Sequence, residues 1–205
     1  MPTDSPLHMT PEEFYAWEEL QPVKHQYYKG EAYAMAGTSV DHNQICINIV
    51  EALRKELQVP CRVFTLDLMV HAASGLNTYP DVFVVCGELE FDDRKKRVIK
   101  NPRIIIEVLS PSTETYDRGL KFDHYKTIPT LQEYLLVSQD RLAVDHSIRG
   151  EGTTWLTQYY RSLADSIQLT SAKASLKLRE IYDQVILPEP EDPNVTQLRI
   201  YGDDR

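Results

Sequence analysis

Two carboxylates lie inside stretches of the sequence that are otherwise apolar. Asp81 follows Pro80 at the start of the run DVFVVC, and Glu107 interrupts the run IIIEVL that begins at Ile104. Such runs are typical of strands covered on both faces, where a carboxylate is rare unless it is hydrogen-bonded, ion-paired or bound to a metal. Two acids that enter one sheet on neighbouring strands can share a hard cation such as Mg²⁺, which can activate water. The sequence therefore indicates a candidate metal site at Asp81 and Glu107.

The same two acids also have a purely structural interpretation. Pro80 lacks the backbone donor of a sheet ladder and therefore marks the entrance of a strand, where Asp81 could cap a loop. Glu107 could form a salt bridge with a buried arginine. The pattern of residue types does not decide between a metal site and these two structural roles.

The N-terminal elements follow from capping signals and hydrophobic spacing. Residues 10–13 (TPEE) combine an N-cap, a proline and an acid three residues after the cap, which predicts a helix to about Leu20. The segment HQYYKGEAYAM predicts two strands around a turn at Lys29 and Gly30. Apolar residues that recur every four positions predict an amphipathic helix from about residue 39 to 58.

The later part of the chain alternates between strands and helices. RVFTLDLMVH predicts an alternating strand, DVFVVC, RIIIEVL and EYLLVS predict buried strands, and Gly87–Pro102 predicts a loop or edge hairpin. Residues 110–113 (SPST) predict the start of a helix that runs to about Lys126. LAVDHSIR, TWLTQYYR and SIQLT predict antiparallel strands at one edge of the sheet, and LREIYDQV predicts a short helix. This order predicts an α/β fold with a mixed central sheet flanked by helices, and with additional antiparallel strands in its N- and C-terminal parts.

Length and composition favour one globular domain. A chain of 205 residues with 42% hydrophobic residues can form a sizeable core, and we expect a single domain over residues 1–187. Residues 188–205 carry three prolines and several acids, and we expect them to form a loose tail. No apolar run reaches the roughly 18 residues of a membrane span, and no secretory signal is visible at the N-terminus, so we expect a cytoplasmic protein.

The three cysteines show no spacing that would indicate a metal site or a disulfide framework. Cys46, Cys61 and Cys86 are far apart, and each has apolar neighbours. An odd number of cysteines in a cytoplasmic chain argues against structural disulfides. We therefore expect all three to be small buried hydrophobic residues.

The net charge of −9 disfavours binding of nucleic acid by the molecule as a whole. The exception is the segment DDRKKRVIKNPR, whose cations include Arg94, Lys95, Lys96, Arg97 and Lys100. Such a run is most often a solvated loop, which is the interpretation we favour. It is also the best candidate in the sequence for contact with a nucleic-acid backbone.

The order of Pro80-Asp81, a spacer and Glu107 resembles the PD-(D/E)xK, or restriction-endonuclease-like, superfamily. The lysine of that pattern falls on Leu109 here. Some families of the superfamily carry the lysine on the following helix, and Lys121 is the candidate because Asp117, Lys121 and Tyr125 are spaced four apart and share a helical face. The segments YKGEAYAM, YPDVFVV, IIIEVLSPST, DRGLK and EYLLV, together with His42, resemble the Uma-type group of restriction endonucleases in particular.

This resemblance implies a restriction-endonuclease-like core and metal-dependent hydrolysis of phosphodiester bonds in DNA. Asp81 and Glu107 would hold Mg²⁺ or Mn²⁺ with the carbonyl of Val108, and Lys121 would stabilise charge on the phosphate. Glu31 matches an acid that the superfamily often supplies from its N-terminal part, although it also fits an exposed turn residue.

Three nearby side chains have supporting roles in this interpretation. We expect Asp117 and Tyr125 to brace Lys121. His42 stands at the start of a predicted helix, where a cap or packing residue is more common than a general base.

The partners and the activity remain open on the sequence alone. Cutting of both DNA strands would favour a homodimer. The alternatives are a catalytically inactive nuclease fold that serves as a binding or assembly module, and a metal-dependent hydrolase with a substrate other than DNA.

Overall fold

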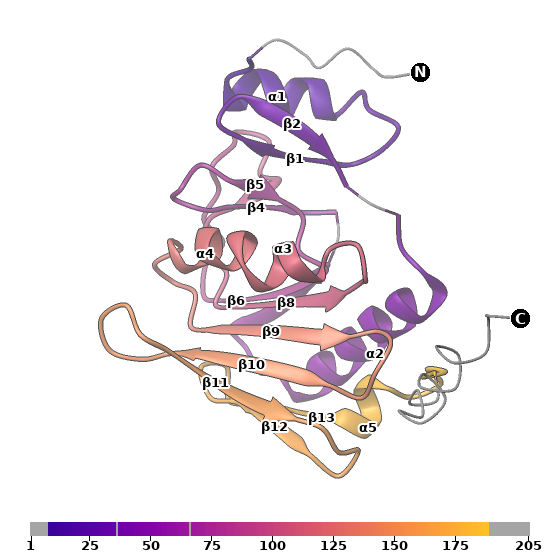
Figure 1. The fold of residues 1–205 in the computed structure, drawn as a ribbon. Helices are drawn as coiled ribbons and strands as arrows, with labels where there is room; N and C mark the ends of the chain where they lie inside the picture. The colour runs from indigo at the N-terminus through magenta and orange to yellow at the C-terminus, as the bar shows by residue number, and fades with distance from the viewer. Residues whose placement is uncertain (1–7, 36, 66, 189–205) are drawn as a thin grey trace, which may run out of the picture.

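The computed structural model describes residues 8–35, 37–65 and 67–188, and its centre is a six-stranded mixed sheet (Figure 1). The strand order is β11-β10-β9-β8-β6-β3. The pairs are antiparallel except for β8 and β9, which run parallel. The strands are β3 Cys61–Thr65, β6 Val82–Cys86, β8 Ile104–Leu109, β9 Glu133–Ser138, β10 Val144–Arg149 and β11 Trp155–Tyr160.

A second sheet of five strands lies beside the first and carries the N-terminal helix α1 (Pro11–Glu18). Its order is β2-β1-β5-β4-β7, with β1 His25–Tyr28, β2 Glu31–Ala34, β4 Met69–His71, β5 Asn77–Thr78 and β7 Val98–Ile99. Lys29 and Gly30 both have positive φ, which is the conformation of a two-residue hairpin turn between β1 and β2. The predicted capping box is present, because the side chain of Thr10 accepts from the amide of Glu13 and that of Glu13 from the amide of Thr10.

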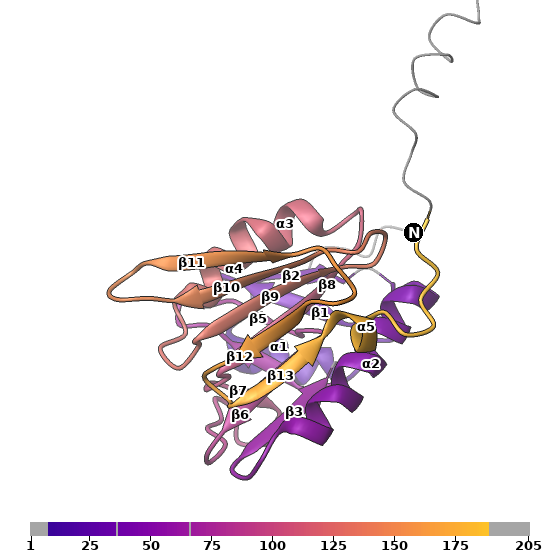
Figure 2. The same ribbon diagram turned by 90° about the horizontal axis from the view of Figure 1, so that it is seen from below.

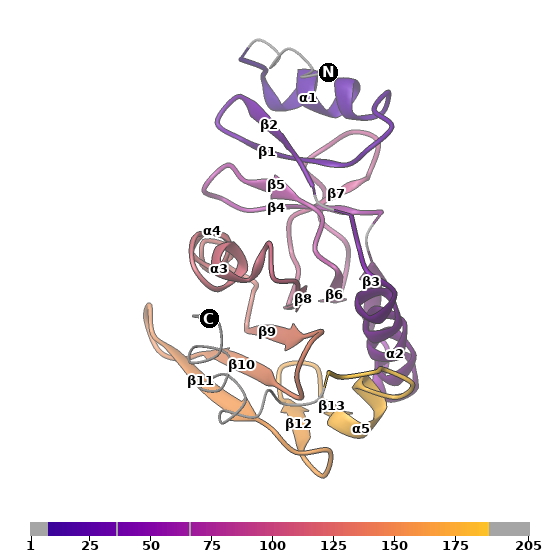
Figure 3. The same cartoon turned by 45° about the vertical axis from the view of Figure 1, so that its right-hand side comes forward.

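Helices cover both faces of the six-stranded sheet (Figure 3). One face of the sheet is covered by α2 (Val40–Glu56), α5 (Leu178–Ile181) and the β12–β13 hairpin (Ser166–Leu169 and Ala174–Lys177). Figure 2 shows β13 leading into α5 beside α2. α3 (Glu114–Arg118) and α4 (Leu120–Lys126) cover the other face. This arrangement confirms the predicted mixed sheet flanked by helices.

The alternation of β8 decides which face each of its side chains joins. Ile104, Ile106 and Val108 belong to the core under α2, whereas Ile105 and Leu109 belong to the core under α4. Because side chains alternate along a strand, Glu107 projects to the α4 side together with Ile105.

Two predicted elements are divided in the structure. The segment RVFTLDLMVH forms β3 and β4 in two different sheets rather than one strand, with residue 66 outside the described residues. The helix predicted up to Lys126 breaks at Gly119, whose φ of −109° and ψ of −103° separate α3 from α4. The loop predicted between β6 and β8 contains the short strand β7, which pairs with β4.

The expectation for the cysteines was wrong for two of the three. Cys61 and Cys86 are directly opposite each other in the β3–β6 register and form a disulfide, which is uncommon in cytoplasmic proteins. Their spacing in the sequence could not reveal this, because the antiparallel register alone brings them together. Cys46 is the free, buried cysteine that was expected.

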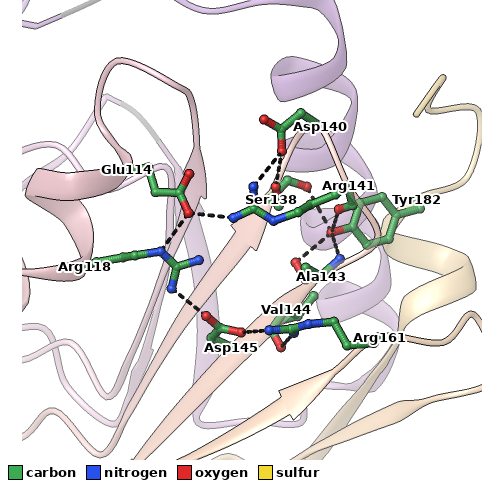
Figure 4. A network of polar contacts seen from close by, with 10 residues as sticks. All are labelled: Glu114, Arg118, Ser138, Asp140, Arg141, Ala143, Val144, Asp145, Arg161 and Tyr182. Carbon is green, nitrogen blue, oxygen red and sulfur yellow. Dashed lines mark hydrogen bonds and ion pairs between the residues drawn. The ribbon is translucent and has the colours of Figure 1, made fainter. Parts of the chain in front are cut away.

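A network of ion pairs fastens α3 to the strands next to it (Figure 4). Arg118 binds Glu114 at 2.8 Å and the buried Asp145 of β10 at 2.5 Å, and Arg161 binds the other oxygen of Asp145 at 2.6 Å. Arg141 reaches Glu114 from the β9–β10 turn at 2.6 Å. The network holds α3 in place over the sheet, immediately before the residues that α4 contributes to the cleft described below.

Among the described residues, no helix has both the length and the apolar character required to cross a membrane. The predicted loose tail, residues 188–205, lies outside the described residues except for Pro188.

Candidate active site

Asp81 and Glu107 meet at the end of two neighbouring antiparallel strands. Asp81 immediately precedes β6, and Glu107 lies in β8. The amide of Asp81 lies 3.4 Å from Oε2 of Glu107, and the amide of Val108 donates to Oδ2 of Asp81 at 2.8 Å. The backbone of the two strands therefore holds the two carboxylates beside each other.

Glu107 is contacted from the α4 side by a lysine and a tyrosine. Nζ of Lys121 lies 2.8 Å from Oε1 of Glu107 and 3.0 Å from Oδ1 of Asp117, and the hydroxyl of Tyr125 donates to Oε1 of Glu107 at 2.8 Å. Lys121 is only 6% exposed and Glu107 only 2%. The partner of the buried Glu107 is thus Lys121 and not an arginine.

Asp81 is contacted from the opposite face of the sheet. His42 lies in the first turn of α2, where Ser39 caps the helix by accepting from the amide of His42 at 3.1 Å. Nε2 of His42 lies 3.3 Å from Oδ2 of Asp81. The cluster therefore wraps around the end of the sheet, with His42 on one face and Lys121 on the other.

The site has three carboxylates against one ammonium group and one imidazole. Three carboxylates, those of Asp81, Glu107 and Asp117, surround the single ammonium group of Lys121. Burial raises the pKa of Glu107 to about 8. The positive charge of Lys121 lowers this pKa, and the negative charges of Asp81 and Asp117 raise it further. A proton on Glu107 therefore neutralises one of the three carboxylates at neutral pH.

The pKa values of Asp81, His42 and Lys121 are shifted in the directions that keep these groups charged. Burial acts to raise the pKa of Asp81, but the hydrogen bond and charge of His42 and the charge of Lys121 outweigh it and lower that pKa. Burial likewise acts to lower the pKa of His42, and the hydrogen bond to Asp81 raises it overall. The pKa of Lys121 is raised by Glu107, Asp117 and Asp81 despite its burial.

We expect the protein in the presence of a chelator to lose stability as the pH rises from about 4.5 to about 8. In this window Glu107 keeps its proton in the folded state and has lost it in the unfolded chain, so the unfolded state binds fewer protons and stability falls with pH. The raised pKa of His42 acts in the same direction. Chemical denaturation across this window should show a decrease of a few kcal/mol, and Glu107→Gln should remove most of the slope. Equal slopes in the two proteins would contradict the raised pKa of Glu107.

The site forms part of the wall of a cleft of about 770 Å³. Asp81, Glu107, Val108 and Lys121 line it, as do Asp117 and His42. The other walls come from the end of the β1–β2 hairpin and the segment before α2, from the loop between β8 and α3, and from Tyr79, Tyr116 and Gln139. A cleft of this size can admit part of an extended ligand to the two carboxylates.

Glu31 is not among the residues that line the cleft. It is exposed on β2, and its carboxylate accepts a hydrogen bond from the hydroxyl of Tyr33. This position matches the exposed turn residue that the sequence left open as the alternative.

Three of the five cations of the basic run contact acids close by. Lys95 and Arg97 both contact Glu19 just after α1, each at 2.5 Å, and Lys100 lies 3.5 Å from Asp92 of its own loop. Arg94 and Lys96 are exposed, and none of the five cations lines the cleft. The run thus has the surroundings of a solvated loop that is tied to α1.

Cys46 and Tyr116 also lie at the site, although neither was predicted there. Sγ of Cys46 lies 3.6 Å from Nδ1 of His42, one helical turn earlier on α2. Tyr116 lines the cleft and donates to Gln26 of β1 at 3.3 Å. The spacing of four between His42 and Cys46 was a usable signal, because residues so spaced share a helical face.

A family model matches most of the chain. Residues 11–179 match the Uma2 family, which is described as "Putative restriction endonuclease". The chain belongs to the Uma2 family. Two similar proteins are from the cyanobacterium Synechocystis sp. "Uncharacterized protein slr1290" is 37% identical over 176 residues, which cover 85% of this chain and 91% of that protein. "Uncharacterized protein sll1609" is 35% identical over 72% of this chain and 85% of its own.

A solved structure shows the same fold as this Uma2 family member. It is described as a "putative nuclease belonging to DUF820" from Anabaena variabilis. It superposes with a TM-score of 0.64 and 18% sequence identity, and the match covers 87% of this chain and 99% of that one. The restriction-endonuclease-like fold expected from the sequence is therefore confirmed.

Proposed function

We propose that this Uma2 family member is a metal-dependent endonuclease that hydrolyses phosphodiester bonds in DNA. The observation that carries the proposal is the convergence of Asp81, Glu107 and Lys121, from three different elements, at the wall of one cleft. The family description and the Anabaena variabilis neighbour support a nuclease. The choice of DNA rests on the resemblance to restriction endonucleases.

The donor set and the charge of the site suit a hard divalent cation. Asp81 and Glu107 would hold Mg²⁺ or Mn²⁺, with the carbonyl of Val108 as a third oxygen ligand, because both ions prefer oxygen donors. The excess of carboxylates over ammonium groups is what such a cation would neutralise. When bound, the ion supplies positive charge to the phosphate and favours ionisation of the attacking water.

The protein's own residues position the reacting groups. Lys121 is held by Glu107 and Asp117, so its ammonium is fixed at the cleft, where it can donate to a phosphate oxygen as negative charge develops. Tyr125 donates a hydrogen bond to the same oxygen, Oε1 of Glu107, and so helps to fix the orientation of that carboxylate. His42 holds Asp81 from the α2 side, and we assign it a positioning role.

The proposal includes a homodimer, since one site cuts one strand and cutting of a duplex in one encounter needs two. Cleavage of a supercoiled plasmid distinguishes a dimer from a monomer. A dimer should give linear product early, whereas a monomer should accumulate the nicked circle first.

The test is cleavage of plasmid, single-stranded DNA and RNA with Mg²⁺ or Mn²⁺, and with chelator. We expect DNA to be cut only with metal, and Asp81→Asn to reduce the rate by about 10²-fold or more. Asp123→Asn is the matched control, because Asp123 is exposed on α4 and pairs with Lys126 away from the cleft. Metal-dependent cutting of RNA alone would redirect the proposal to another substrate. No cutting of any substrate would favour an inactive binding or assembly module.

A further inference from the structure

A second set of metal-ligating side chains lies on the α2 side of Asp81. Ligand atoms of His42, Cys46 and Asp81 all lie within 4.8 Å of one another. Nδ1 of His42 is 3.6 Å from Sγ of Cys46, and Nε2 is 3.3 Å from Oδ2 of Asp81. Helical spacing aligns the first two residues, and the entrance of β6 brings in the third.

These donors differ in kind from those between Asp81 and Glu107. Thiolate and imidazole ligands select borderline and soft ions such as Zn²⁺ and have little affinity for Mg²⁺. Bonds of about 2.0–2.3 Å around tetrahedral Zn²⁺ place neighbouring ligand atoms roughly 3.3–3.8 Å apart. The separations of 3.6 Å and 3.3 Å involve different ring nitrogens of His42, and an ion binds only one of them. The three donor atoms lie within 4.8 Å of one another, so the imidazole ring must rotate to bring one nitrogen close to both Sγ of Cys46 and the carboxylate of Asp81.

The site is reachable from solvent. His42 and Asp81 line the cleft, whereas Cys46 is buried behind His42. An ion that enters through the cleft would therefore meet the imidazole and the carboxylate first and the thiol last. Water in the cleft can supply the fourth ligand that a tetrahedral ion requires.

We propose that His42, Cys46 and Asp81 form a binding site for a thiophilic divalent ion such as Zn²⁺. This site shares Asp81 with the proposed Mg²⁺ or Mn²⁺ site at Asp81 and Glu107, called the hard-ion site below. Zn²⁺ and the hard ion would therefore compete for the carboxylate of Asp81. If the proposed nuclease function holds, a consequence that rests on it is inhibition of cleavage by Zn²⁺.

The first experiment uses Co²⁺ as a spectroscopic probe for Zn²⁺ and does not depend on activity. Chelator-treated protein without reductant is titrated with Co²⁺. We expect one equivalent to bind with visible bands of a four-coordinate ion and a thiolate-to-cobalt charge-transfer band in the near ultraviolet. Zn²⁺ should bleach these bands. Absence of the charge-transfer band in the native protein would overturn the proposal.

Three variants assign the band. Cys46→Ser should abolish it, whereas the double variant Cys61→Ser/Cys86→Ser, which removes the disulfide, should keep it. Glu107→Gln should also keep it, because Glu107 belongs to the hard-ion site alone. A band that persists in Cys46→Ser would refute the site. If Cys46→Ser does not fold, protection of Cys46 from alkylation by Zn²⁺ in the native protein provides the same test, and equal alkylation rates with and without Zn²⁺ would refute the site.

Inhibition of cleavage by Zn²⁺ then tests the link between the His42, Cys46 and Asp81 site and the proposed nuclease activity. The Zn²⁺ concentration that halves Mn²⁺-dependent cleavage should rise at least about tenfold in Cys46→Ser relative to the native protein. A native protein that shows the cobalt band but does not cut DNA would support the metal site and overturn the nuclease. An unchanged Zn²⁺ dependence in Cys46→Ser would refute the competition.

Discussion

Glu107→Gln is expected to abolish cleavage and at the same time to stabilise the protein in the presence of a chelator. The amide keeps an oxygen that can accept from Tyr125 and Lys121, both of which contact Oε1 of Glu107 at 2.8 Å. The substitution removes one of the three carboxylates around the ammonium group of Lys121. It also removes the buried group whose pKa is raised. Stability at pH 8 should therefore increase, while the second carboxylate of the hard-ion site is lost.

The expected magnitudes are a fall in the cleavage rate of about 10³-fold and a rise in Tm of about 5 °C at pH 8 with chelator. Added Mn²⁺ should raise the Tm of the native protein and leave that of the variant unchanged, since binding to the folded state alone stabilises it. Glu151→Gln is a suitable control because Glu151 is exposed in the β10–β11 turn. A destabilised Glu107→Gln protein, or one that cuts DNA at the native rate, would contradict this account of the site.

Lys121→Met is expected to abolish cleavage and to destabilise the fold. Methionine retains much of the length of the side chain but leaves Glu107 and Asp117 without the ammonium group that lies 2.8 Å and 3.0 Å away. Removal of one partner of a buried ion pair typically costs about 3–5 kcal/mol because a buried charge is left uncompensated. The loss should grow above pH 8, because there Glu107 of the native protein is ionised and paired with Lys121, whereas the variant has no ammonium group to favour the ionised form.

Urea denaturation of four proteins tests this coupling: the native protein, Lys121→Met, Glu107→Gln and the double variant. The double variant should be more stable than Lys121→Met, with an interaction energy of about 1–3 kcal/mol, and should still not cut DNA. Lys126→Met is the control on the same helix, because its pair with Asp123 is more exposed and contributes about 0.5 kcal/mol at most. Additive effects in the double variant would show that Lys121 and Glu107 do not form a coupled pair. Cleavage by Lys121→Met at the native rate would remove Lys121 from the proposed mechanism.

Local sequence determined the elements and the two acids of the site. The capping box at residues 10–13, the turn at Lys29 and Gly30, and the apolar spacing of α2 depend on neighbouring residues, so each could be predicted without knowledge of the fold. Asp81 and Glu107 stood out because a carboxylate in an apolar strand requires a partner. The spacing of four between Asp117 and Lys121 predicted that both side chains share one helical face. They do form an ion pair, even though Gly119 interrupts the helix between them.

Tertiary structure alone decided how these pieces meet. The pairing of β3 with β6 joins Cys61 to Cys86, and the division of RVFTLDLMVH between two sheets follows from packing that no local pattern encodes. The end of the six-stranded sheet brings His42 and Cys46 of α2 to one side of Asp81 and Lys121 of α4 to the other side of the site. Contacts between residues far apart in the chain depend on strand register and on which face each helix covers, and these are properties of the assembled core.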